Sequence, residues 1–447
     1  MYRSVLLLIV LAYLALATLY AVFTPKWQAP DEPAHFNYIR TIAETGRLHI
    51  LQQGDYDHDY LEKIKAAKFP PTMPIDAIRY ESYQPPLYYL AAVPVYLVAR
   101  AGGIDAQVLA LRLFSVALGV IVLLLAFAIV REIFPDDSLL ALATVGAIAT
   151  VPMHIAISAS ISNDTAAELV LALILLLAIK RVNNAVTDSR FVVLGGILFG
   201  ATLLTKTTTY IPDALLLIVA EVVHQRNTQY AIRGAWGVVR VPSTLLMLFP
   251  LAVLLASPMF IRGMLTYGIT DPLGIARHDA IVVGQPTTVE MIAKHGLKNI
   301  LFDLFVVTFK SFWAQFGWMG VLVNDRIYVA LFLLTSIALF GLALYALRVL
   351  RRRELLTAAQ WTCIGLLAMM TIAAMADYIL YNCKFLQLQG RYLFPALIPI
   401  ALFGVLGLRE IVAREYHRIV FALLYVALVA LDAVCLFWFI VPQLRNS

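Results

Sequence analysis

Residues 5–36 read VLLLIVLAYLALATLYAVFTPKWQAPDEPAHF and join a purely apolar segment to a polar one. The apolar part, residues 5–23, carries no charge and approaches the roughly 20 residues that a helix needs to cross a bilayer core. The acidic pair Asp31-Glu32 follows at once. Ionisable groups near hydrocarbon are costly and usually functional or paired. The stretch therefore predicts a membrane protein with chemistry at one membrane surface.

Composition extends this prediction to the whole chain. Of 447 residues, 61% are hydrophobic and 14% charged, which is far outside the range of soluble globular proteins. We expect an all-α polytopic membrane protein, with residues 1–447 forming a single integral membrane domain. The net charge of +6 comes largely from short arginine clusters between apolar runs, which orient helices and do not predict a nucleic-acid partner.

Apolar runs predict about eleven membrane spans. They cover residues 5–23, 113–130, 139–157, 164–179, 191–204, 210–223, 242–256, 327–347, 358–376, 393–408 and 419–440.

The apolar segment 87–99 decides the topology. If it lies in the interface, the short basic loops all fall on one side of the membrane, which is the cytoplasm by the positive-inside rule. If it crosses the membrane, every later basic cluster moves to the outer side, against that rule. The sequence therefore favours the interfacial position for residues 87–99. The clusters are Arg131; Lys180, Arg181 and Arg190; Arg226, Arg233 and Arg240; Arg348 and Arg351 to Arg353; and Arg409, Arg414 and Arg418.

This topology leaves two long outer segments. Residues 24–112 form the first, which carries the acidic motif, the interfacial segment and two expected amphipathic helices, from Pro33 to Glu44 before Gly46 and from Tyr60 to Lys68. Residues 257–326 form the second. We expect both to face outward from the cytoplasmic membrane.

Several polar residues near apolar runs come out at the outer boundary, and each has a structural alternative. Asp31 and Glu32 precede Pro33, so either could cap the next helix, but a cap needs only one acid and we favour a catalytic site. For Asp164, capping and function are equally good interpretations. Lys206 is equally well explained as a snorkelling lysine or as a phosphate ligand.

Further candidates accompany these residues. Arg391 follows Gly390 and suits bidentate phosphate recognition. Glu81, Gln84 and Arg262 lie at the same predicted boundary. Trp313 and Trp318 are interpreted first as interface-belt aromatics and second as a sugar-stacking platform.

Other chemistry lacks a sequence signal. The histidines show no metal-ligand spacing such as His-x-x-x-His, and the cysteines Cys363, Cys383 and Cys435 are few and far apart. No Gly-x-x-x-x-Gly-Lys loop or Gly-x-Gly-x-x-Gly turn supports direct use of nucleotides.

Taken in order, these motifs resemble the GT-C glycosyltransferases, membrane enzymes that use polyprenyl-phosphate sugars. The resemblance is to the aminoarabinose and protein mannosyltransferase type, and closest to an uncharacterised, DUF2142-like prokaryotic branch. It rests on Asp31-Glu32, on Tyr80-Glu81-Ser82-Tyr83-Gln84-Pro85-Pro86-Leu87, on Asn163-Asp164, on Leu204-Thr205-Lys206 and on Gly390-Arg391-Tyr392. Gln84 departs from the pattern, because such relatives place a phosphate-contacting lysine there.

The resemblance implies transfer of a sugar from a polyprenyl-phosphate donor to a lipid-linked glycan, a polysaccharide or a protein. Asp31, with Glu32, would be catalytic. Glu81, Gln84, Asp164, Lys206, Arg262 and Arg391 would bind the donor and its phosphate. No cofactor is certain; a divalent Mg or Mn ion held by Asp31 and Asp164 stays open. The alternatives are a transporter or flippase of lipid-linked saccharides and a non-catalytic scaffold.

Overall fold

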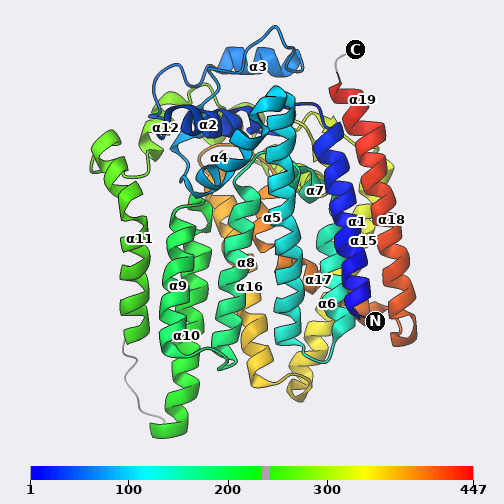
Figure 1. Ribbon diagram of the computed structural model, residues 1–447. Coiled ribbons are helices and arrows are strands. Elements are labelled where there is room, and N and C mark those ends of the chain that lie inside the picture. The colour runs from blue at the N-terminus through cyan, green and yellow to red at the C-terminus, as the bar shows by residue number, and fades with distance from the viewer. Residues whose placement is uncertain (1, 234–241, 446–447) are drawn as a thin grey trace.

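The computed structural model describes residues 2–233 and 242–445 of the chain. Figure 1 shows a bundle of upright helices with shorter elements gathered at one end, which we call the site end. There lie α2 (Glu32–Thr45), α3 (His58–Ala66), α4 (Leu87–Ala99) and α12 (Ile275–Ile281). The predicted all-α polytopic class is confirmed, since the described part contains only one pair of two-residue strands, β1 (Gln315–Phe316) and β2 (Val321–Leu322).

The upright helices make up most of the remaining chain. They are α1 (Tyr2–Phe23), α5 (Gly103–Ile133), α6 (Ser138–Ala149), α8 (Asp164–Val182), α9 (Asp188–Leu203), α10 (Tyr210–Arg233), α11 (Ser243–Tyr267), α15 (Asp325–Arg351), α16 (Ala358–Asn382), α17 (Leu397–Ile411) and α18 (His417–Val434). Shorter helices are α7 (Pro152–Ser158), α13 (Thr288–His295), α14 (Leu297–Trp313) and α19 (Val441–Leu444).

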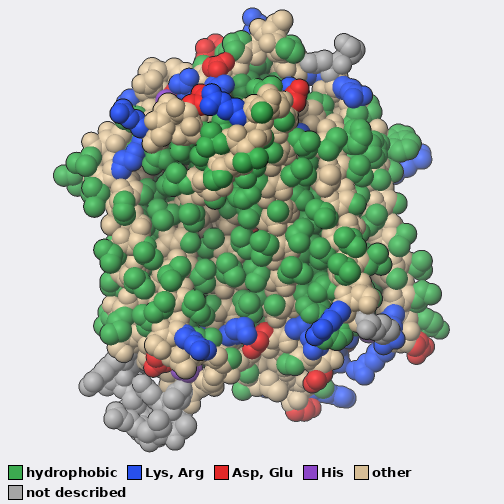
Figure 2. All heavy atoms as spheres, in the orientation of Figure 1, with side chains coloured by type: hydrophobic (Ala, Val, Ile, Leu, Met, Phe, Trp, Pro, Cys, Tyr) green, Lys and Arg blue, Asp and Glu red, His purple; other side chains and the backbone are tan. Residues whose placement is uncertain are grey.

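Seven helical stretches are long and apolar enough to cross a membrane, or eight if a bent pair counts as one span. Figure 1 shows α8, α9 and α10 running upright beside them. In Figure 2 a broad apolar band separates two ends that carry the charged side chains. The count of about eleven spans stays a prediction.

The span predicted at residues 139–157 is not one straight helix. It consists of α6 and α7, which meet at a bend of 69°. Pro152 is the first residue of α7. A residue before proline avoids helical backbone angles, whereas proline itself suits a first helical turn, so the chain breaks and restarts here.

Two helix boundaries also differ from expectation. Helix α5 begins at Gly103, whereas the sequence placed the start of this span after the charged Arg112. Arg112 lies within the helix, where its charge is buried in an ion pair with Glu32. Helix α11 continues past Ala256 to Tyr267 despite Pro258. The second outer segment therefore begins inside a helix, and it contains α14, which the sequence analysis missed.

The smaller helices agree better with expectation. The two predicted amphipathic helices are α2 and α3, and α2 ends at Gly46 with φ 67°, a left-handed angle that glycine adopts freely. The segment 87–99 forms α4, which lies across the site end in Figure 1. Where they are described, the predicted basic clusters lie at the opposite end, at the ends of α5, α8, α15 and α17. Of their arginines, Arg240 lies outside the described residues.

The elements at the site end have a core of their own. Phe36 and Ile39 of α2 pack in one cluster with Ile64 of α3, Tyr89 of α4 and Leu51 of the loop between α2 and α3. All five side chains are almost fully buried. Trp27, which precedes Asp31, belongs to the same cluster, so this packing holds the chain on both sides of Asp31.

Candidate active site

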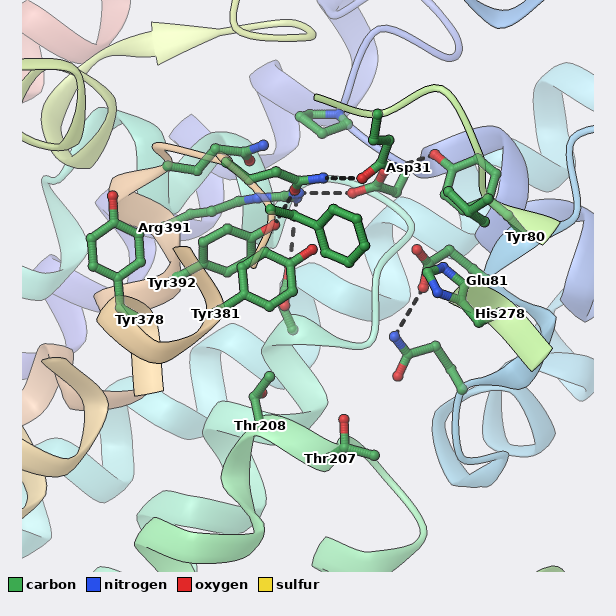
Figure 3. Close-up of a pocket in the computed structure, with 18 of the residues that line it drawn as sticks. Asp31, Tyr80, Glu81, Thr207, Thr208, His278, Tyr378, Tyr381, Arg391 and Tyr392 are labelled. Carbon is green, nitrogen blue, oxygen red and sulfur yellow. Dashed lines mark hydrogen bonds and ion pairs between the residues drawn. The ribbon is translucent and has the colours of Figure 1, made fainter. Parts of the chain in front are cut away.

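A cavity of about 800 Å³ lies at the site end. Its walls come from α2, η1 (Tyr80–Tyr83), α8, η3 (Thr207–Thr209), α12, α16 and η5 (Gly390–Ala396). Figure 3 shows charged and aromatic side chains from these elements turned toward one another. The predicted site residues that line the cavity are Asp31, Glu81, Gln84, Asp164, Lys206 and Arg391.

Asp31 occupies the position before α2 but does not cap it. Its φ of 66° is left-handed, and its side chain makes no capping hydrogen bond. Instead Oδ1 accepts a hydrogen bond of 2.7 Å from the Tyr80 hydroxyl, and Oδ2 accepts one of 2.7 Å from Nη2 of Arg391. A non-glycine residue held at positive φ stores strain, which is typical of functional sites. The backbone thus turns this carboxylate into the cavity.

Arg391 connects the two acidic sides of the cavity. Its Nη1 lies 3.9 Å from Oδ2 of Asp164, while Nη2 binds Asp31. The residue is 8% exposed, and its Nε has no hydrogen-bond partner among the described residues. A guanidinium at the wall of a cavity is suited to an incoming anion.

Lys206 and Asp164 form the second pair. The Lys206 Nζ contacts Oδ1 of Asp164, whose Oδ2 accepts 2.9 Å from the Ser162 hydroxyl. Lys206 lines the cavity and does not extend away from it, so the snorkelling interpretation is not needed. Asp164 begins α8, yet its carboxylate is occupied by cations of the cavity.

The electrostatics of Asp31 depend on Arg391. Burial alone would raise the pKa of the Asp31 carboxyl, but the Arg391 guanidinium, together with the hydrogen bonds from Arg391 and Tyr80, holds that pKa below its usual range. Tyr80 shows the opposite shift. Burial and the neighbouring Asp31 charge raise the pKa of its hydroxyl well above the usual value. Asp31 is therefore an ionised but weak base while Arg391 is bound to it.

Glu81 has the reverse shift. Burial and the neighbouring Asp31 charge raise its pKa to about 7. Its Oε2 accepts 2.9 Å from Nε2 of Gln84, whose Oε1 faces Nδ2 of Asn163 at 3.4 Å. Gln84 is thus a neutral neighbour of Glu81.

Glu32 is not part of the cavity wall. It is fully buried, and its two carboxylate oxygens accept 2.7 Å hydrogen bonds from Nε and Nη2 of Arg112. The Trp27 backbone N–H donates to the same carboxylate over 2.9 Å. Glu32 therefore anchors the loop before α2 to α5, and the adjacent acids Asp31 and Glu32 point in different directions. The prediction of a catalytic Glu32 does not fit this position.

Arg262 also lies outside the cavity wall. Its Nη2 donates to the carbonyls of Leu48 and His49 over 2.9 and 3.0 Å. This arginine ties α11 to the loop after α2, so the predicted contact with the donor phosphate does not fit its position.

Several cavity residues had no predicted role: His35, His278 and Tyr381, and also Tyr80 and Tyr392, although these two stand in the motifs quoted above. His35 binds the Tyr89 hydroxyl at 2.8 Å, and burial lowers its pKa to about 4, so it is neutral at pH 7. Trp318 also lines the cavity, and its Nε1 donates to the Trp27 carbonyl over 2.9 Å. The tyrosine-rich run around Tyr80 was the one sequence feature that could have indicated these cavity residues.

A divalent ion between Asp31 and Asp164 was left open by the sequence. In the structure Arg391 and Lys206 already neutralise these carboxylates. No group of three His, Cys, Asp or Glu side chains is arranged for a metal within residues 2–233 and 242–445. This donor set does not fit a metal ion, and no step is derived through one.

Comparison with known proteins identifies the family. Residues 65–401 match the family described as predicted membrane protein (DUF2142). The chain belongs to this family. It is an integral membrane protein, as the family description and the apolar helices both indicate. No curated protein matches the sequence.

Solved structures share the fold of this DUF2142 protein. The apo oligosaccharyltransferase of Archaeoglobus fulgidus is similar with a TM-score of 0.51 and 15% identity, over 99% of this chain and 55% of that chain. ArnT from Cupriavidus metallidurans bound to undecaprenyl phosphate gives 0.50 and 13%, over 98% of this chain and 73% of that chain. The chain thus spans about half the length of the oligosaccharyltransferase. The predicted GT-C-type fold is confirmed.

Proposed function

We propose that this protein is a glycosyltransferase that moves a sugar from a polyprenyl-phosphate donor to a cell-envelope acceptor. The observation that carries the proposal is the position of Arg391, buried between Asp31 and Asp164 at the wall of the cavity. An anion-binding group beside a carboxylate base is the arrangement that displacement of a sugar phosphate requires.

Binding of the donor would reorganise this centre. The donor phosphate competes with Asp31 for Arg391 and with Asp164 for Lys206. As Arg391 turns to the phosphate, the pKa of Asp31 rises and the carboxylate becomes a stronger base. Donor binding and base activation are thereby coupled through one guanidinium.

Transfer then follows as a single displacement. Asp31 takes the proton of an acceptor hydroxyl, and the acceptor oxygen forms a bond to the anomeric carbon. The bond between that carbon and the phosphate oxygen breaks, and the electron pair leaves with the phosphate, whose charge Arg391 and Lys206 stabilise. Because attack and departure lie on opposite faces of the sugar, the configuration inverts.

We place this reaction on the outer face of the cytoplasmic membrane. The described basic clusters lie at the opposite end of the bundle from the cavity, and the positive-inside rule assigns such clusters to the cytoplasm. The cavity also lies at one end of the bundle, whereas transporters bind substrates near the midplane. This favours the enzyme over a flippase.

Release of polyprenyl phosphate tests the proposal. Purified protein is supplied with a panel of polyprenyl-phosphate sugars and membrane extract as acceptor, beside Asp31→Asn and the control Asp105→Asn. Asp105 is an exposed partner of Lys26 outside the cavity. The proposal is supported if wild type and Asp105→Asn release polyprenyl phosphate and Asp31→Asn releases it about 10²–10⁴-fold more slowly. Transfer from a nucleotide sugar without lipid carrier, or retention of configuration, would contradict it.

A further inference from the structure

Besides Glu81, which is hydrogen-bonded to Gln84, two carboxyl groups of the cavity have no lysine or arginine partner among the described residues. They are Glu168 of α8 and Asp377 of α16. By contrast, Asp31 is paired with Arg391 and Asp164 with Lys206. Neither Glu168 nor Asp377 has a role in the proton transfer or the phosphate contacts described above.

Glu168 forms part of the cavity floor. It follows Asp164 by one helical turn on the same face of α8, which places it about 6 Å further into the bundle. It is 7% exposed and also borders a small apolar void with Met370, Phe394 and Ile398 below the cavity. A carboxyl at this depth is costly unless it has hydrogen-bond partners.

His154 holds Glu168 in one orientation. The Nε2 of His154 lies 2.9 Å from Oε2 of Glu168, and His154 is 1% exposed. Its Nδ1 has no partner in the described part of the chain, so Nε2 is the ring atom that bonds Glu168. The second oxygen of Glu168, Oε1, accepts no hydrogen bond from any described residue. One acceptor is thus fixed in the cavity wall and unused.

Asp377 supplies a second free acceptor. It lies on the α16 face that lines the cavity with Ala374, Tyr378 and Tyr381, and no described residue forms a hydrogen bond or ion pair with it. Helices α8 and α16 are in contact, so both acids line one continuous space. Thr207 and Thr208, which follow Lys206, lie across an open space from Tyr381 and Tyr392 (Figure 3).

We propose that Glu168 and Asp377 form the subsite for the sugar of the donor and accept hydrogen bonds from its ring substituents, with His154 as the positioning residue for Glu168. The inference rests on the proposed function, because that function places the donor phosphate at Lys206 and Arg391. The sugar is bonded directly to that phosphate, and Glu168 lies about 6 Å along α8 from Asp164, the partner of Lys206. Sugars carry several hydroxyl donors, whereas the carrier phosphate carries none at neutral pH.

The test compares carriers with and without a sugar. The full-length protein in lipid nanodiscs is titrated with undecaprenyl phosphate and with undecaprenyl phosphates that bear glucose, mannose or N-acetylglucosamine, without acceptor. The variants are Glu168→Gln, Asp377→Asn and the control Glu132→Gln, which alters an acid at the opposite end of the bundle. Glutamine at position 168 keeps the size and an acceptor for His154.

We expect at least one glycosylated carrier to bind wild type more tightly than the bare carrier. Each cavity variant should lose about 10- to 100-fold in affinity for that carrier, because hydrogen bonds to charged groups are the strong ones, and less than about twofold for the bare carrier. Equal losses for both carriers, or no loss, would overturn the subsite. So would a panel in which no sugar adds affinity. Failure of wild type to bind bare carrier would instead overturn the proposed function. If Glu168→Gln does not fold, Asp377→Asn decides the matter, because Asp377 has no partner among the described residues to lose.

Discussion

Arg391 and Asp31 stand 360 positions apart in the sequence and are joined by a 2.7 Å hydrogen bond from Nη2 to Oδ2 inside the cavity. The bond keeps Asp31 a weak base and keeps Arg391 in place until an anion competes for it. Binding and base strength are therefore linked at one contact.

Removal of the Arg391 charge should weaken carrier binding. In Arg391→Gln we expect the affinity for undecaprenyl phosphate to fall by about 10- to 100-fold, since a charged hydrogen bond to phosphate is lost. Arg262→Gln is the matched control, because Arg262 binds two backbone carbonyls outside the cavity wall. Titration of both variants in nanodiscs measures the difference. Equal losses in the two variants would contradict the assignment of the phosphate to Arg391.

The buried pair of Glu32 and Arg112 should matter for stability. Both side chains are at most 3% exposed, so loss of one partner leaves an uncompensated buried charge. We expect Glu32→Gln to lower the free energy of unfolding by about 3–5 kcal/mol, seen as a lower thermal midpoint in detergent. Lys26→Met, which breaks an exposed pair with Asp105, should cost less than about 1 kcal/mol. A Glu32→Gln variant as stable as wild type but without transferase activity would restore the catalytic role.

Glu81 should make stability depend on pH. Its pKa of about 7 exceeds the usual 4.5, so the folded protein holds this proton more tightly than the unfolded chain does. The stabilisation is complete below pH 4.5 and is lost as pH rises through 7. Relative to Glu81→Gln, wild type should therefore lose about 1–2 kcal/mol between pH 5 and pH 8.

Thermal midpoints across this pH range check the prediction. The difference between wild type and Glu81→Gln should grow with pH, and Glu415→Gln, which alters an exposed acid at the other end, is the control. His35 is present in all three proteins, so its own titration cancels. A constant difference for Glu81→Gln would show that the group does not titrate in this range.

The sequence predicted the helical class and the polar side of the cavity for a physical reason. Charges near the ends of apolar runs are rare enough to stand out, and Asp31, Asp164, Lys206 and Arg391 all lie near such ends. Glu168 and Asp377 lie within helices, where the facing direction depends on neighbouring helices that one sequence does not reveal. The same limit applies to Glu32, whose partner Arg112 is 80 positions away. Adjacent acids looked equivalent because only the left-handed backbone at Asp31 separates their directions.

Gly390 provides the last prediction, because it controls how closely Arg391 approaches the bundle. A β-carbon at Gly390 would lie 2.3 Å from the Phe312 backbone nitrogen and 2.4 Å from the Thr308 carbonyl oxygen of α14. These are backbone atoms that cannot rotate away, and the Gly390 N–H also donates to the Ser311 hydroxyl over 2.7 Å. Gly390→Ala should therefore push η5 off α14, lower stability by about 1–3 kcal/mol and displace the guanidinium of the next residue.

The measurement pairs thermal unfolding with carrier binding. Gly404→Ala in α17 is the control, since a β-carbon there meets no atom within 4 Å and should be neutral or slightly stabilising. We expect Gly390→Ala to lose both stability and affinity for undecaprenyl phosphate, and Gly404→Ala to lose neither. If Gly390→Ala lost stability but bound the carrier normally, the position of Arg391 would not depend on the contact between η5 and α14, and the tight packing would serve the fold alone.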